Sequence, residues 1–313
     1  MGFSRRTGTR FGTQEGTKWP SDGVFSGVID AALIAGGVVP RASWDCASAL
    51  YSLSPQVLIR IERSSDNMQE VIGWSPSTGA VDEAAIALHC AGTNGYIVSF
   101  IERGGNSAYD LVQSTQTLRH KIYDSVTGVS KVGSLPAWVA TSDGYYGPTG
   151  NSLGFTGSPN IATTYMAQFP SAISVQHMIG SNGSSTGWGT GVNEAGRPVA
   201  GYRYPPPAGT GGRCEFTPLH AVTQMCGYHW DWTAGGLLQS GGATCRQDGA
   251  ALAEHSSATL GSMAMIAQSY NFGFVGATAP RSTGMIVHST KPAGAVLAVF
   301  EAFQATRRTL AGY

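Results

Sequence analysis

Short segments in which apolar and polar residues alternate make up most of this chain. The first spans residues 57–63, VLIRIER, where apolar side chains alternate with charged ones before a polar Ser-Ser-Asp-Asn turn begins. This alternation predicts a β-strand that runs into a turn. We expect the charged side chains of this strand to be solvated or to lie in an interface: Arg60, Glu62 and Arg63.

Further short runs of the same kind follow along the chain. A second strand is expected at 69–74, and from about residue 96 onwards the runs recur between Gly, Ser-Asn-Gly and Asp-Gly turns. Many short strands separated by such turns are typical of a β-sandwich or jelly roll, so the sequence predicts an all-β fold. The runs are GYIVSFIE, YDLVQS, KIYDS, AWVAT, IATTYMAQF, AISVQHMIG, HAVTQMCGYHWDW, GGLLQS, TCRQDGAALAEH, MAMIAQS and GMIVHS.

A few stretches depart from this alternation and predict short helices. Residues 28–40 can form one that a Gly-Gly pair ends, and Ser43 can cap a second over residues 44–52. Residues 81–91 combine helix-forming side chains with acidic residues in the first turn and a glycine after the last. Helices are therefore expected near 28–52 and at 81–91.

The first 27 residues show neither a helical nor a strand period. They are rich in Gly, Thr and Arg, and we interpret them as an extended arm that can tether the protein to a neighbour in an assembly. Residues 28–313 are expected to form one domain, in which the Gly- and Pro-rich segment 203–213 is a surface loop. The isolated aromatic residues of the arm are Phe11, Trp19 and Phe25.

Low charge and high glycine content restrict the classes of partner. Only 12% of the residues are charged and 43 are glycine, while 19 acidic and 19 basic side chains give a net charge of zero. A neutral chain has no electrostatic footprint for nucleic acid or anionic lipid, and no apolar run is long enough to span a membrane. No apolar segment typical of a secretion signal follows the N-terminal Arg-Arg pair, so if the protein works outside a cell, we expect it to get there as part of a particle or by lysis.

The residue types that bind metals or form disulfides are scattered. We expect reduced, buried thiols at all five cysteines, with a disulfide among the last three as the alternative, and neither Cys nor His residues fall at metal-ligand spacing. Asp124 and Asp143 are candidate ligands for a calcium ion; no other cofactor is expected. The cysteines are Cys46, Cys90, Cys214, Cys226 and Cys245.

Residues 49–113 resemble the beginning of a known family of catalytic domains. The segments that carry the likeness are ALYSL (49–53), IRIERSSDN (59–67), VIGW (71–74), VDEAAIALHCAG (81–92) and NGYIVSFIERGGNSAYDLVQ (94–113). In this order and spacing they are similar to family 54 α-L-arabinofuranosidase catalytic domains and to many phage and bacterial virion or tail proteins related to those domains.

The resemblance implies a concanavalin A-like, laminin-G-like jelly-roll sandwich. The segment TCRQDGAAL (244–252) is similar to the Asp-Gly strand turn of that fold, and NFGFVGATA (271–279) to its late Phe-x-Gly strand. Residues 291–313 resemble the short terminal helix of the related phage domains. A helix is therefore expected near 293–310.

The catalytic features of the family are missing from this chain. A retaining glycosidase needs a nucleophile and an acid, with carboxyl groups about 5–5.5 Å apart. The family's enzymes carry them in Gly-Asn-Ala-Glu and Gly-Gly-Asp-Asn contexts, which do not occur here, and Ile-Glu-Arg-Gly-Gly at 101–105 replaces the family's Tyr-Asp-Gln-Ser-Gly run. We therefore expect no catalytic site; the nearest carboxylates are Glu194, Asp231 and Asp248.

Aromatic and polar residues near turns are candidates for binding a glycan, because sugar rings stack on aromatic faces while polar groups hold the hydroxyls. The segment WGTGVNEAGRPVAGYRY offers such a set, with a structural role as the alternative. Three alternating aromatics in YHWDW, 228–232, are better explained as core residues. The glycan-binding candidates are Trp188, Asn193, Glu194, Tyr202 and Tyr204.

We interpret the chain as a bacteriophage or phage-like virion structural protein, located in the tail, a spike or fibre, or a capsid decoration. The arm would anchor a jelly roll that displays a surface for host glycan, and the partners would be other virion proteins and copies of the chain itself. The alternative is a retaining glycoside hydrolase of arabinofuranosidase type.

Overall fold

The computed structural model describes most of the chain. The described residues are 27–36, 40–52, 56–102, 107–141, 145–148, 162–169, 176–181, 187–192, 195–203, 213–220, 223–232, 243–257, 270–273, 280–288 and 291–313. The N-terminal arm inferred at 1–27 lies outside them except for Gly27.

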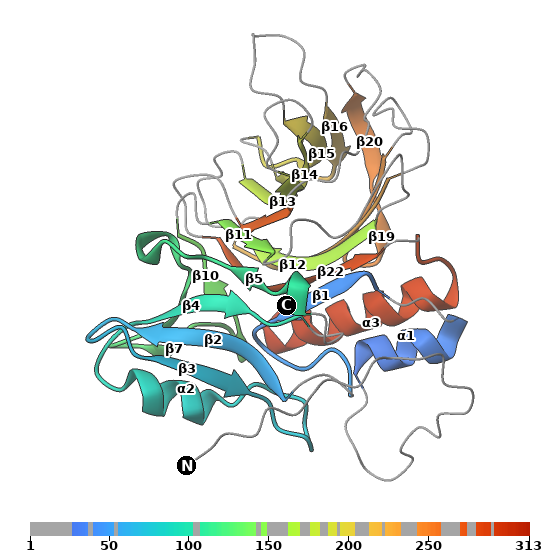
Figure 1. The fold of residues 1–313 in the computed structure, drawn as a ribbon. Coiled ribbons are helices and arrows are strands. Elements are labelled where there is room, and N and C mark those ends of the chain that lie inside the picture. Colours follow the sequence, from blue (N-terminus) through green and yellow to red (C-terminus); the bar gives the residue numbers. More distant parts are fainter. Residues whose placement is uncertain are drawn as a thin grey trace.

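Twenty described strands pair into one continuous antiparallel arrangement that folds into two layers (Figure 1). In the first layer the strand order is β18-β17-β12-β22, and β22 also pairs with β1 and β10; from β10 the pairing continues through β6, β4, β2 and β3. The strands of this layer are β1 (Ala42–Asp45), β2 (Val57–Arg63), β3 (Gln69–Gly73), β4 (Gly95–Phe100), β5 (Leu111–Val112), β6 (Lys121–Asp124), β7 (Gly128–Val129), β10 (Trp138–Val139), β12 (Ala162–Gln168), β17 (Met225–Trp232), β18 (Ala243–Gln247), β19 (Ala250–Ala251) and β22 (Arg281–His288).

The second layer lies above the first in Figure 1 and has the order β11-β21-β13-β14-β15-β16-β20. The layers are joined where β11 pairs with β5. The strands of this layer are β11 (Tyr145–Pro148), β13 (Gln176–Ser181), β14 (Gly187–Val192), β15 (Pro198–Arg203), β16 (Arg213–Thr217), β20 (Ala253–Ser257) and β21 (Tyr270–Gly273); β8 (Lys131–Val132) and β9 (Leu135–Pro136) form a separate hairpin.

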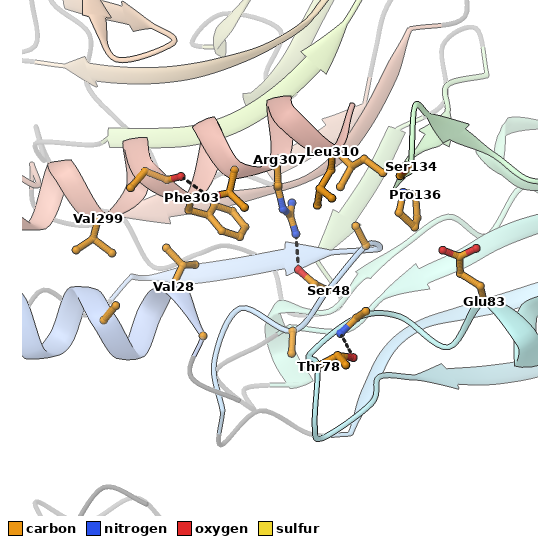
Figure 2. Close-up of a pocket in the computed structure, with 18 residues that line it drawn as sticks. Val28, Ser48, Thr78, Glu83, Ser134, Pro136, Val299, Phe303, Arg307 and Leu310 are labelled. Carbon is orange, nitrogen blue, oxygen red and sulfur yellow. Dashed lines mark hydrogen bonds between the residues drawn. The ribbon is translucent and has the colours of Figure 1, made fainter. Parts of the chain in front are cut away.

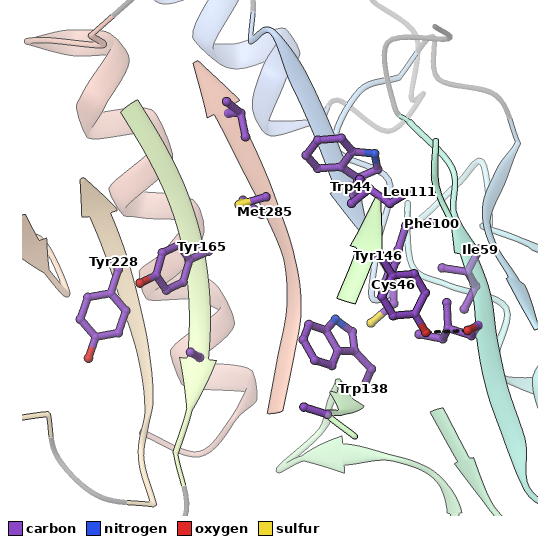
Figure 3. Close-up of a cluster of buried hydrophobic side chains, with 14 of the residues drawn as sticks. Trp44, Cys46, Ile59, Phe100, Leu111, Trp138, Tyr146, Tyr165, Tyr228 and Met285 are labelled. Atoms are coloured by element: carbon purple, nitrogen blue, oxygen red, sulfur yellow. Dashed lines mark hydrogen bonds between the residues drawn. The ribbon is translucent and has the colours of Figure 1, made fainter. Parts of the chain in front are cut away.

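Large aromatic side chains fill the space between the layers. Trp230 of β17 meets Phe216 of β16 edge to face, with the ring centroids 5.6 Å apart, so the inner faces of both sheets are in contact. Nearer β4, Phe100 packs against Trp138 and Tyr146, as Figure 3 shows. The expectation that the aromatics of YHWDW belong to the core is confirmed for Tyr228 and Trp230, which are fully buried.

Helices cover the outer face of the first sheet. Helix α3 (Ala295–Leu310) lies on that face and contacts α1 (Val28–Gly36), as Figure 1 shows. Gln304 donates from Nε2 to the carbonyls of Tyr165 and Tyr228, at 3.0 and 2.9 Å. Gly227 has no room for a Cβ, which would lie 2.7 Å from the Gln304 side chain, so a glycine permits this close approach. The remaining helices are α2 (Glu83–Cys90), η1 (Ser107–Tyr109) and η2 (Gln116–Leu118).

The observed elements confirm an all-β jelly-roll sandwich and most of the expected helices. The helices expected at 81–91 and near 293–310 are α2 and α3, and α2 is capped by Asp82, which accepts from Ala85 N at 2.9 Å. The second helix expected over residues 44–52 is wrong. Trp44 lies instead in β1 and pairs with Met285 of β22, because a buried strand in the middle of the sheet overrides the local helical pattern.

Candidate functional site

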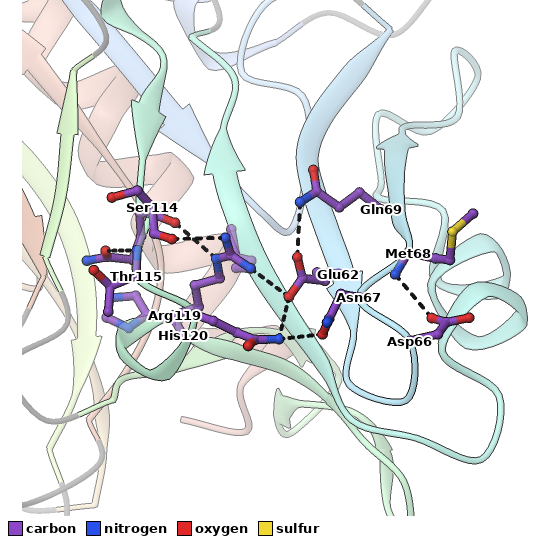
Figure 4. Close-up of polar contacts among 12 residues, drawn as sticks. Glu62, Asp66, Asn67, Met68, Gln69, Ser114, Thr115, Arg119 and His120 are labelled. Atoms are coloured by element: carbon purple, nitrogen blue, oxygen red, sulfur yellow. Dashed lines mark hydrogen bonds and ion pairs between the residues drawn. The ribbon is translucent and has the colours of Figure 1, made fainter.

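Glu62, in the segment that carries the family resemblance, forms a buried ion pair with Arg119. Glu62 of β2 is 4% exposed and its Oε1 lies 2.6 Å from Arg119 Nη1. Gln116 donates to the same oxygen at 2.8 Å. Gln69 donates to Oε2 at 3.0 Å, as Figure 4 shows. The expectation that Glu62 is solvated or at an interface is therefore wrong: its Oε1 joins β2 to the 113–119 segment, and its Oε2 accepts from Gln69 of β3.

Asp231 of β17 belongs to a second buried polar chain. His229 Nε2 lies 3.1 Å from Asp231 Oδ1, and Thr164 Oγ1 lies 2.9 Å from His229 Nδ1 and 3.2 Å from His288 Nε2. His229 Nε2 donates to the Asp231 carboxylate, and the Thr164 hydroxyl, which can both donate and accept, lies between the two imidazoles. At the end of this series of contacts, Lys291 Nζ forms an ion pair with Asp231 Oδ2 at 3.0 Å.

This order of Thr, His and Asp is that of a nucleophile with its base and orienting acid, but its position argues against catalysis. Thr164, His229 and Asp231 are each at most 2% exposed. They lie on the face of the first sheet opposite the interlayer core, and the Phe300 ring of α3 packs edge-on against His288, 4.7 Å away. No substrate can reach the Thr164 hydroxyl, so the chain of hydrogen bonds is structural.

Charge around Asp231 is balanced within the fold. Burial alone would raise the pKa of Asp231, but the hydrogen bond from His229 and the nearby Lys291 ammonium together hold that pKa below its usual value. Burial lowers the pKa of His288 to about 3, so this imidazole stays neutral at physiological pH. Asp231 is thus an ionised scaffold carboxylate, whereas a glycosidase acid must carry a proton.

Asp248, the other described carboxylate candidate, also has a structural role. It adopts a left-handed conformation with φ 54° in the turn after β18, accepts a hydrogen bond from Gly227 N at 2.8 Å and pairs with Arg308 of α3 at 3.3 Å. Gly227 lies four residues before Asp231 in β17, which corresponds to about 13 Å of strand. That separation exceeds the carboxyl spacing of about 5–9.5 Å that retaining and inverting glycosidases use.

The glycan-binding candidates lie around the β14–β15 hairpin of the second sheet. Trp188 of β14 is directly opposite Tyr202 of β15 in the strand register, two positions along from the buried pair Thr190 and Ala200. Because strand positions two apart fall on the same face, positions 188 and 202 share the face of that buried pair. The other candidates, Asn193, Glu194 and Tyr204, lie outside the described residues.

A groove opens on the outer side of the molecule between α1 and α3. It encloses about 720 Å³ and is mainly apolar. Figure 2 shows Phe303 and Leu310 of α3 on one side and Val28 of α1 on the other. We call this the α1–α3 groove; its remaining walls are residues 47–49, the turn at 78–80 and the β8–β9 hairpin.

No group of three or more His, Cys, Asp or Glu side chains in the described part of the chain could hold a metal ion. Asp124, a calcium candidate, is engaged by Lys121 and by the amides of Val126 and Thr127, while Asp143 lies outside the described residues. The expectation of reduced, buried thiols is confirmed for all five cysteines. None of the described helices combines the length and apolar character needed to cross a membrane.

Comparison with known proteins identifies the fold. No protein-family model and no curated protein matches the chain. Among solved structures, an arabinofuranosidase complexed with arabinofuranosyl-α-1,2-xylobiose has a TM-score of 0.60 and 14% identity, over 90% of this chain and 65% of that one. A GH54 α-L-arabinofuranosidase soaked with a cyclic sulfate inhibitor has a TM-score of 0.58, 13% identity and the same coverage. This chain therefore has the β-sandwich fold of those enzymes and spans 65% of their length.

Two features of the described site region were not predicted from the sequence. The first is the Glu62–Arg119 ion pair. The second is the series of polar contacts that runs from Lys291 through Asp231, His229 and Thr164 to His288. Both join residues that are far apart in the sequence. The one available signal was the strand pattern of YHWDW, where His229 and Asp231 share the face opposite the aromatics. That pattern places the two residues together but does not reveal Thr164 or His288, which come from neighbouring strands.

Proposed function

We propose that this protein is a virion structural protein whose β-sandwich binds host-surface glycan without hydrolysing it. The observation that carries the binding proposal is the direct opposition of Trp188 and Tyr202 on the second sheet of a sandwich with the arabinofuranosidase fold. Positions 188 and 202 lie two residues beyond the buried pair Thr190 and Ala200, next to the strand ends at Gly187 and Arg203. Two opposed aromatic residues at such a strand end can provide a platform on which a sugar ring stacks.

The carboxylates favour binding over turnover. Asp231 is buried in an ion pair with Lys291, and Asp248 is tied to Gly227 and Arg308. Neither is free to act as a nucleophile or acid. Both are needed by the scaffold, because removing a buried partner leaves an uncompensated charge.

A glycan array tests the binding proposal. The wild-type protein is expected to bind a defined subset of glycans, and Trp188→Ala and Tyr202→Ala should each weaken binding by about tenfold or more, since one sugar-stacking aromatic is worth roughly 1–2 kcal/mol. Tyr313→Ala, which removes an exposed tyrosine at the C-terminus, is the matched control and should bind as wild type. Equal binding by all four proteins would contradict the proposal.

The location on a virion is supported by the resemblance of residues 49–113 to phage virion and tail proteins and by the neutral, weakly charged composition, which suits packing against copies and partners. Gold-labelled antibody and electron microscopy of purified particles test it. Label at a defined position on the head or tail is expected. Particles that lack the protein altogether would contradict this assignment.

A retaining glycoside hydrolase remains the second candidate because the structures of similar fold are arabinofuranosidases. It requires Glu194, which lies outside the described residues, to supply a catalytic carboxylate. Release of 4-nitrophenol from an aryl α-L-arabinofuranoside, abolished in Glu194→Gln, would establish this candidate and overturn the purely structural role.

A further inference from the structure

The α1–α3 groove presents apolar surface whose polar neighbours already have partners. Val28, Val299, Phe303 and Leu310 supply its apolar walls, and Leu310 is 47% exposed. An apolar groove of this size, open to water, favours an occupant that brings aromatic or aliphatic side chains.

The charged residues of the groove leave little for a polar ligand. Arg307 is held by Asp45, and Glu83 lies 2.5 Å from Lys131. A charged ligand would have to displace one of these ion pairs. The chemistry of the groove therefore points to a hydrophobic segment of polypeptide.

The chain enters the described structure at the wall of this groove. Gly27 lines the groove, donates from its amide to Asp30 Oδ2 at 2.8 Å and accepts from Ala31 N at 3.1 Å. A Cβ on Gly27 would lie 2.3 Å from Leu50 O, so the Gly27 backbone packs directly against the backbone of Leu50.

A buried acceptor at the same place has no hydrogen-bond partner within the described part of the chain. Asp30 is 2% exposed; its Oδ2 accepts from Gly27 N and from Ser52 N, but its Oδ1 accepts from no group among the described residues. A buried carboxylate oxygen without a donor is costly. Backbone N–H groups of the residues just before Gly27 are close to Asp30 in the sequence and are candidates to supply one.

The sequence before Gly27 carries suitable side chains. Phe25 is two residues away, within about 7 Å of extended chain, and Trp19 is eight residues away, within about 28 Å. Each such ring buries roughly 150–250 Å² when it packs. Because the segment is attached at the groove, its effective concentration there is in the millimolar range or above.

We propose that residues 19–26 of the same chain fold back along the α1–α3 groove and place Phe25 against α3, with a backbone amide donating to Asp30 Oδ1. The groove is then an internal receptor for the N-terminal arm, which fixes where the arm leaves the sandwich. This inference does not depend on glycan binding.

Limited trypsin digestion tests the proposal because the segment begins just after a cleavage site. Cleavage between Lys18 and Trp19 should be slow in the wild-type protein, whereas cleavage after Arg10 should be fast and serves as the internal control. Ala302→Trp fills the groove and should speed cleavage after Lys18 by about tenfold, equivalent to about 1.4 kcal/mol of docking.

Two further variants keep the test decisive. Ala305→Trp alters an exposed alanine of the same helix that does not line the groove and should leave the cleavage rate unchanged. Phe25→Ala should match Ala302→Trp without altering the folded groove. Equal rates after Lys18 in wild type, Ala302→Trp and Phe25→Ala would overturn the proposal. Protection that disappears on dilution would also overturn it, since that would assign the groove to the arm of a second copy.

Discussion

Arg307 of α3 holds Asp45 of β1 in a bidentate ion pair, with Nη1 2.6 Å from Oδ2 and Nη2 2.9 Å from Oδ1, although 262 residues separate them. Arg307 also donates to Thr283 Oγ1 at 2.7 Å and to Ser48 Oγ at 2.5 Å. Asp45 in turn accepts from the amides of Ala47 and Ser48. Both carboxylate oxygens of Asp45 and both terminal nitrogens of the Arg307 guanidinium are thus engaged, and they attach the C-terminal helix to the first sheet.

Removing one side of this pair should be strongly destabilising. Arg307→Met leaves the Asp45 carboxylate buried and uncompensated, which costs about 3–5 kcal/mol in the free energy of unfolding. Chemical denaturation at neutral pH measures it. Arg308→Met, next along the same helix, breaks the more exposed pair with Asp248 and should cost about 1 kcal/mol or less. Equal losses in the two variants would contradict this account of α3.

The Glu62–Arg119 pair should also be needed for stability. Glu62→Gln removes the charge that balances Arg119 in the interior, so a loss of roughly 3 kcal/mol is expected. The neighbouring pair between Arg63 and Asp66 is solvent-exposed, and Asp66→Asn should change stability little. Denaturation curves of both variants provide the comparison; an unaltered midpoint for Glu62→Gln would show that the network is dispensable.

Buried histidines should make the fold sensitive to acid. Burial lowers the pKa of His120 and of His288 to about 3 each, and that of His220 to about 4, from an ordinary value near 6.5. Between about pH 6.5 and pH 3 the unfolded chain therefore binds protons at these histidines, whereas the folded chain does not. The contribution of the neutral histidines to the free energy of unfolding is complete above pH 6.5 and is lost as pH falls towards 3.

At pH 5 each of these histidines should reduce the free energy of unfolding by roughly 1–2 kcal/mol. Urea denaturation at pH 7, 6 and 5 measures the decline. His288→Leu removes one titrating group, so its stability should fall less steeply over the same range. A stability that stays flat from pH 7 to pH 5 would refute the neutral, buried state of these imidazoles.

The thiols should be inert in the native protein. Burial raises the pKa of Cys46 and Cys245 far above the ordinary value, and that of Cys90 and Cys214 to about 11. Because the thiolate is the reactive form, a thiol reagent at pH 7.5 should label none of the five cysteines until denaturant is added. Mass spectrometry counts the labels; rapid labelling of the folded protein would contradict the burial of these residues.

Local pattern was enough to predict several elements but not their pairing. Strand β2 follows from the alternation in 57–63, and α2 from its acidic first turn and helix-forming residues. The strand at Trp44 was missed because its partner, Met285, lies near the other end of the chain. Likewise, alternation put Glu62 among the charged positions and could not show that Arg119 would cover it.

The candidate site was predictable only in part. The aromatic residues flanking the Gly-rich hairpin were recognised from composition, but the direct opposition of Trp188 and Tyr202 depends on the register of β14 and β15. The α1–α3 groove could not be predicted, because its walls come from segments that meet only after the sandwich has formed.

The most direct test of the central claim is affinity capture of a glycan identified on the array, followed by mass measurement of that glycan. The account predicts that the wild-type protein retains the glycan at unchanged mass, while Trp188→Ala and Tyr202→Ala do not retain it. A shortened product that forms with the wild-type protein and disappears in Glu194→Gln would contradict the account and establish a hydrolase.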